Sequence, residues 1–122
     1  GSGKSSVVLA GLIPWLEELG WHILEPIKPG FKPLTMLESL LLPYFRDDQQ
    51  LLDQCINNQD GEGLKPLLKL FPREHKFLLV VDQFEELFTF ALAEQRDRFI
   101  ELITQVATIP DSPLAVIATM RA

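Results

Sequence analysis

Two continuous apolar runs stand out in a chain that otherwise mixes polar and hydrophobic positions. They are Phe77–Val81 and Leu114–Ala118, and neither contains a polar residue. Apolar runs of this length are typical of parallel strands that are buried on both faces of a sheet. A third strand is predicted over Trp21–Ile27, and a loop rich in proline and glycine follows it.

Between the predicted strands, hydrophobic residues recur at the spacing of amphipathic helices. Pro14 breaks the first helix or starts a short second one that stops at Gly20. This alternation predicts an α/β fold, in which crossover helices connect the strands of a parallel sheet. The helices are predicted over residues 4–13, about 35–43, about 47–58, 64–71 and about 94–108, with another directly after Asp82.

The composition fits one globular domain and narrows its partners. The chain has 122 residues, of which 47% are hydrophobic, and a formal net charge of −6. That charge argues against a nucleic acid or an anionic membrane surface as the main partner. No apolar run has the length of a membrane span. Cys55 is the single cysteine, so no internal disulfide forms; this fits a reducing compartment, and we expect a cytoplasmic protein.

The start of the chain fits the second half of a phosphate-binding loop that runs into a helix. Its glycines let backbone N–H groups approach phosphate oxygens, and the following helix points its positive end at the same anion. Lys4 would reach the β- and γ-phosphates, and the Ser5 hydroxyl would bind Mg²⁺. The alternative is a Gly-Ser cloning remnant followed by an ordinary serine helix cap. The predicted nucleotide-binding residues are Gly1, Ser2, Gly3, Lys4, Ser5 and Ser6.

Asp82 directly follows the first apolar run, which is the Walker B arrangement. A carboxylate there would hold Mg²⁺ through its water shell, opposite the Ser5 hydroxyl. The alternative is that Asp82 caps the helix that follows. Glu85 and Glu86 come next, where the helix dipole alone favours acids. Many related ATPases place a glutamate where this chain has Gln83, so we take Glu85 as the candidate that orients the attacking water.

Arg121 lies just past the last predicted strand. Ligands of parallel α/β sheets bind beyond the carboxyl ends of the strands, where Asp82 also lies. An arginine there would contact the γ-phosphate and sense whether it is present. The alternative is an exposed charge at the end of a strand.

Three further stretches can be compared with known families: Gly1–Ser6 with Ala10–Pro14, Leu78–Phe88 and Val116–Ala122. Together they resemble the STAND class of signal-transducing P-loop ATPases, and in particular its novel STAND NTPase family. The stretch Leu78–Phe88 is the most specific, because it looks like the family's own Walker B signature and makes Gln83 normal at its position. Lys28-Pro29-Gly30 also looks like a loop of this family, so the resemblance covers nearly the whole chain.

The resemblance implies ATP and Mg²⁺ as cofactors, with Lys4 and Ser5 in Walker A, Asp82 on the metal and Arg121 as the sensor. It implies an ATP-binding, slowly hydrolysing switch domain of a larger bacterial protein, with protein partners bound through flanking domains. The alternative is a nucleotide-dependent interaction scaffold without significant turnover. A GTPase is disfavoured because the chain lacks a guanine-recognition motif.

By the same resemblance, residues 1–122 form an incomplete three-layer P-loop NTPase sandwich that lacks the first strand and the later strands. The Phe77–Val81 strand should lie in the middle, between the Trp21–Ile27 and Leu114–Ala118 strands. The outer edge of the last of these strands would then be unpaired, which is an aggregation hazard.

Overall fold

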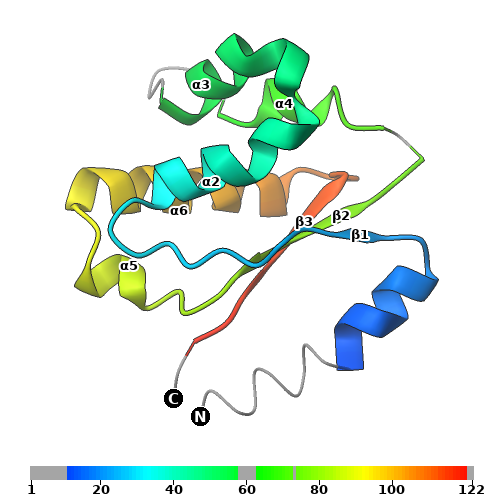
Figure 1. The fold of residues 1–122 in the computed structure, drawn as a ribbon, viewed down its shortest axis with the longest axis horizontal. Coiled ribbons are helices and arrows are strands. Elements are labelled where there is room, and N and C mark those ends of the chain that lie inside the picture. The colour runs from blue at the N-terminus through cyan, green and yellow to red at the C-terminus, as the bar shows by residue number, and fades with distance from the viewer. Residues whose placement is uncertain (1–10, 58–62, 73, 121–122) are drawn as a thin grey trace.

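The computed structural model describes residues 11–57, 63–72 and 74–120 and has an α/β fold built on a three-stranded parallel sheet (Figure 1). The strands are β1 (His22–Ile23), β2 (Phe77–Val81) and β3 (Leu114–Ala118), and their order in the sheet is β1-β2-β3. The predicted order is therefore confirmed, with β2 in the middle. In the β2–β3 register, Phe77 pairs with Leu114 and Val81 with Ala118.

The first strand is shorter than the Trp21–Ile27 segment that was predicted. Only His22 and Ile23 form regular strand, and Ile27 rejoins β2 through an isolated bridge to Val81. Pro26 lies in the interrupted part and has no N–H to donate. The Ile27 N–H donates to the Val80 carbonyl at 3.0 Å, so the chain still follows β2 to its carboxyl end.

The sheet separates two layers of helix, as a P-loop-like sandwich requires. On one side, the helices labelled α2 to α6, which lie between Pro33 and Thr108, bury a large cluster that includes Leu79 and Val81 of β2. On the other, helical residues 11–18 cover Leu78 and Val80 with the side chain of Leu16 (Figure 1). The alternate residues of β2 thus serve opposite layers, which explains why the whole strand is apolar.

The main helices follow the predicted pattern with local shifts. Pro33 occupies the first turn of its helix, so that helix starts two residues earlier than Thr35. Residues 11–18 are helical on both sides of Pro14, so the predicted break there is wrong; backbone bonds such as Leu19 N–H to Trp15 carbonyl continue past it. Gly20 (φ 91°) ends this helix as predicted. The labelled helices are α2 (Pro33–Leu41), α3 (Gln49–Asn57), α4 (Lys65–Leu68), α5 (Glu86–Thr89) and α6 (Ala93–Thr108).

Two short 3₁₀ segments, Leu42–Tyr44 and Arg46–Asp48, join α2 to α3. Pro43 lies in the first of them and prevents α2 from continuing.

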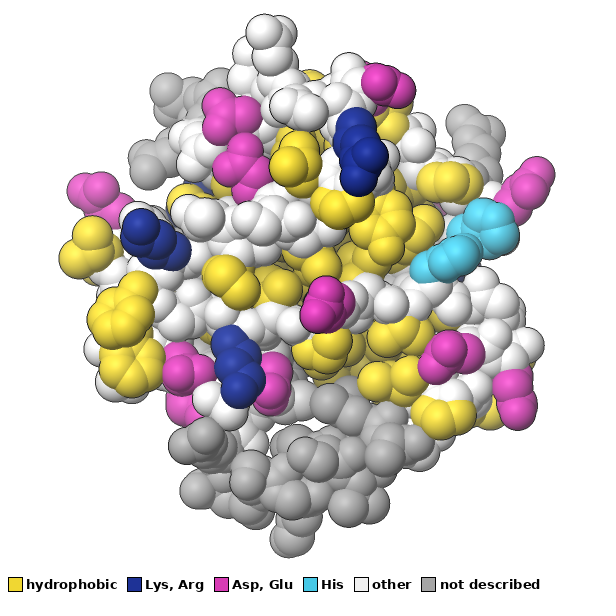
Figure 2. Space-filling model, viewed as in Figure 1, with side chains coloured by type: hydrophobic (Ala, Val, Ile, Leu, Met, Phe, Trp, Pro, Cys, Tyr) yellow, Lys and Arg dark blue, Asp and Glu magenta, His cyan; other side chains and the backbone are white. Residues whose placement is uncertain are grey.

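Within the described ranges, no helix is long and apolar enough to cross a membrane. Hydrophobic side chains are in view across the middle of the face shown in Figure 2, while acidic ones lie mostly around it.

Candidate functional site

Asp82 and Thr119 lie side by side at the carboxyl ends of β2 and β3. The register pairs Val81 with Ala118, so the next residue on each strand brings Asp82 opposite Thr119. The Thr119 hydroxyl donates a hydrogen bond to Asp82 Oδ1 at 2.7 Å. Thr119 is buried and Asp82 is half-buried. A carboxylate is thus held at the edge of the sheet where α/β proteins bind their ligands.

The backbone on either side fixes this pair in place. The Asp82 N–H donates to the Ile27 carbonyl at 2.8 Å, which ties it to the segment after β1. The Thr119 N–H donates to the Val81 carbonyl at 2.9 Å, and the Thr119 carbonyl accepts from the Phe84 N–H at 2.8 Å. Asp82 is therefore connected to both neighbouring segments of the sheet.

The turn after Asp82 differs from the helix predicted to start there. Gln83 has a φ of 57°, in the left-handed region that a non-glycine residue rarely occupies, and its N–H donates to Thr119 Oγ1 at 3.3 Å. Helix α5 begins only at Glu86, and no side chain caps it. The interpretation of Asp82 as a helix cap is therefore wrong, because its carboxylate accepts from Thr119 instead.

Glu85 and Glu86 lie on this turn and at the start of α5. Glu85 occupies the N-cap position with helical backbone angles (φ −61°, ψ −21°), and Glu86 is the acidic residue of the first turn. Both side chains are half-buried. The assignment of the water-orienting role to Glu85 stays a prediction.

The other predicted site residues, Gly1–Ser6 and Arg121, lie outside the described residues. The structure therefore brings Asp82 together with a residue to which the sequence analysis gave no role, Thr119. Part of its signal was present in the sequence, where it is a polar residue directly after an apolar run; its position level with Asp82 follows only from the register of the strands.

The donors at this edge fit a hard cation that is shared with phosphate. Mg²⁺ is usually held in proteins by one or two carboxylates, with substrate phosphates and water as the other ligands. Asp82 supplies one carboxylate, and its Oδ1 is oriented by Thr119. Among the described residues no group of three or more His, Cys, Asp or Glu side chains is arranged to hold a metal alone.

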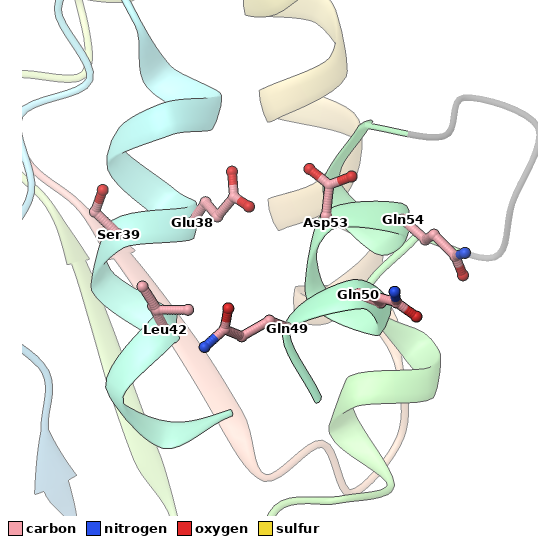
Figure 3. Close-up of a pocket in the computed structure, with 7 residues that line it drawn as sticks. All are labelled: Glu38, Ser39, Leu42, Gln49, Gln50, Asp53 and Gln54. Carbon is pink, nitrogen blue, oxygen red and sulfur yellow. The ribbon is translucent and has the colours of Figure 1, made fainter. Parts of the chain in front are cut away.

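A separate groove of about 670 Å³ lies between α2 and α3 and shares no residue with the predicted site (Figure 3). Glu38 of α2 and Asp53 of α3 project into it from opposite sides. Asp53 Oδ1 accepts a hydrogen bond from the side-chain amide of Asn57 at 2.9 Å. The residues that line the groove are Glu38, Ser39, Leu42, Gln49, Gln50, Asp53 and Gln54.

Comparison with known proteins gives one match. The model of the family described as Novel STAND NTPase 1 matches residues 1–122. No curated protein and no solved structure matches the chain.

Proposed function

Because the chain belongs to the Novel STAND NTPase 1 family, we propose that it binds ATP, hydrolyses it slowly and serves as a switch in signal transduction. The family is one of NTPases, and the α/β architecture agrees with a nucleotide-binding domain of this type. We further propose that it acts in the cytoplasm as one domain of a larger multidomain protein.

One observation carries the proposal: the Asp82 carboxylate is held at the carboxyl end of the central strand by the Thr119 hydroxyl. In this reading residues 1–6 bind the phosphates, with Lys4 on the β- and γ-phosphates. Ser5 and Asp82 hold Mg²⁺ between them. The metal supplies positive charge that stabilises the phosphate oxygens during transfer.

Two further residues complete the proposed reaction. Glu85 orients the water that attacks the γ-phosphate, and Arg121 contacts that phosphate to distinguish ATP from ADP. The position of Glu85 three residues after Asp82, on the turn that leaves β2, supports its assignment. The position of Arg121 two residues after Thr119 supports a role at the same edge of the sheet.

The test uses the full-length protein and measures binding and turnover separately. Mg²⁺·ATP should raise the melting temperature, because a ligand at about 100 times its Kd adds about 2.7 kcal/mol to the free energy of unfolding. Lys4→Ala should abolish that rise. Asp82→Asn should keep measurable binding but strongly reduce single-turnover hydrolysis of ATP.

Asp53→Asn is the matched control, because it makes the same change in the groove between α2 and α3. It should leave both measurements as in the wild type. An unchanged melting shift in Lys4→Ala would place the nucleotide elsewhere. Binding without turnover in the wild-type protein would favour the alternative, a nucleotide-dependent scaffold module for protein partners.

A further inference from the structure

We propose that Thr119 is a positioning residue that orients the Asp82 carboxylate toward Mg²⁺; this inference rests on the proposed function. Thr119 is 7% exposed. A hydroxyl is costly to bury unless its hydrogen-bonding groups are satisfied.

The hydrogen bonds around Thr119 allow only one arrangement of protons. The Gln83 N–H is a donor and must give its hydrogen to Thr119 Oγ1, at 3.3 Å. The Thr119 hydroxyl gives its own hydrogen to Asp82 Oδ1, at 2.7 Å. The hydroxyl is thus oriented toward Asp82, and the bond has the short length of a charge-assisted one.

This bond also sets the direction of the carboxylate. With Oδ1 held by Thr119, rotation of the Asp82 side chain is restricted, and Oδ2 is the oxygen that a bound ion or its water would meet. The hydroxyl is itself fixed, because the Thr119 N–H and carbonyl both bond to segments on either side of Asp82. Residues that hold a metal ligand in this way commonly change metal affinity when they are replaced.

The left-handed turn at Gln83 belongs to the same arrangement. The N–H of this residue, whose φ is 57°, donates to Thr119 Oγ1. Backbone strain of this kind persists where the surrounding contacts determine it, and such residues cluster at functional sites. The strained turn and the buried hydroxyl therefore belong to one hydrogen-bonded arrangement that ends at Asp82.

The experiment measures the affinity of Mn²⁺ for the full-length protein with bound ADP, by electron paramagnetic resonance. Thr119→Val keeps the shape of the side chain and removes the hydroxyl. It should weaken Mn²⁺ binding roughly 10- to 100-fold, as is usual for the loss of a partner that orients a metal ligand. Thr119→Ser keeps the hydroxyl and should restore affinity to within about threefold. Binding of ADP in the presence of a chelator should stay unchanged in both variants.

A double substitution separates positioning from general damage to the fold. In an Asp82→Asn background, Thr119→Val should cause no further loss of Mn²⁺ affinity, because Thr119 acts through that carboxylate. Thr119→Ala provides the same comparison if Thr119→Val does not fold. If Thr119→Val binds Mn²⁺ with wild-type affinity, or loses as much affinity in the Asp82→Asn background as in the wild-type background, then Thr119 does not position Asp82. Either outcome would leave the proposed function standing. Absence of nucleotide binding in the wild-type protein would overturn the proposed function, and this inference with it.

Discussion

At the scale of single residues, Gly63 shows how closely α6 is packed against the loop before α4. Gly63 has a φ of 66°, and a Cβ at this position would lie 1.8 Å from Oε1 of Gln105. An alanine would therefore meet a backbone penalty, whereas the end of the flexible Gln105 side chain can move aside at little cost. We expect Gly63→Ala to reduce the free energy of unfolding by about 1 kcal/mol, as measured by urea denaturation.

A Gln105→Ala background tests this division, because it removes the side chain that has to move. Gly63→Ala should cost about the same 1 kcal/mol there, since the cost is due to the left-handed backbone. Gly11, where a Cβ would meet no atom within 4 Å, is the control and should accept alanine without loss. A clearly smaller cost in the Gln105→Ala background would show that the contact with Gln105, rather than the backbone, sets the cost.

Single residues also show how much of the candidate site could be predicted from the sequence. Asp82 is recognisable because it directly follows an apolar run, although the sequence alone also allowed it to be a helix cap. Its partner was not predicted, since the bond from Thr119 depends on the register of β2 and β3. The left-handed backbone of Gln83 was not predictable either, because glutamine carries no preference for it.

At the scale of elements, a buried arginine joins α6 to the end of α3. Arg98 is 3% exposed, and its guanidinium donates to the carbonyls of Cys55 and Ile56 at 2.9 and 3.1 Å. These carbonyls lie in the last turn of α3, where helix carbonyls lack partners and the dipole favours a cation. Nη1 of Arg98 also contacts Glu101 at 3.3 Å. The guanidinium thus caps α3 from a neighbouring helix.

Replacing Arg98 should therefore loosen α3 in particular. Arg98→Met keeps most of the side-chain length and should lower the free energy of unfolding by about 3 kcal/mol, since hydrogen bonds from a charged donor are lost. Burial raises the pKa of the Cys55 thiol, with Arg98 acting in the opposite direction. The thiol is therefore slow to react until α3 opens. Labelling of Cys55 by a thiol reagent should be at least about tenfold faster in the variant.

Arg96→Met is the control for this element, because Arg96 is on the same helix but 30% exposed, paired with Asp97 and placed over the ring of Phe88. A partly exposed ion pair and cation–π contact each contribute about 0–1 kcal/mol, so stability and labelling should change much less than in Arg98→Met. If Arg98→Met labels no faster than Arg96→Met, the guanidinium does not hold α3 in place.

The elements themselves were largely predictable, and the exceptions have local causes. β2 and β3 match the predicted runs because strands buried on both faces leave an unbroken apolar sequence. β1 is shorter because Pro26 interrupts its ladder. The helix after Asp82 starts late because the turn through Gln83 bonds to Thr119 first. Both the late start of α5 and the capping of α3 by Arg98 depend on contacts between segments that are distant in the sequence, so the local pattern could not predict them.

At the scale of the whole molecule, the described sheet ends on β3, which pairs only with β2 within this part of the chain. The Thr119 N–H and the Pro113 carbonyl both bond toward β2. Strand alternation then turns the N–H groups of Val116 and Ala118 away from β2, while the Leu114 N–H donates to Ser112 Oγ at 3.2 Å. Such an edge is a template for pairing with another chain. The strand order that places β3 at this edge was predicted from the family resemblance, because the hydrophobic pattern alone predicts strands but not which strands are neighbours.

We expect the isolated 122-residue chain to self-associate through this edge of β3. Ala118 is exposed at the end of the strand, so Ala118→Lys adds a charge to the edge without entering the core. Charged side chains, lysine above all, are the usual protection of exposed edges. Sedimentation velocity across a concentration series should show larger species for the wild-type chain and mostly monomer for the variant.

Ala107→Lys makes the same change of net charge on the exposed surface of α6 and should associate like the wild type. If both lysine variants reduce association equally, net charge rather than the β3 edge controls it, and a wild-type chain that stays monomeric at every concentration would remove the edge as a hazard.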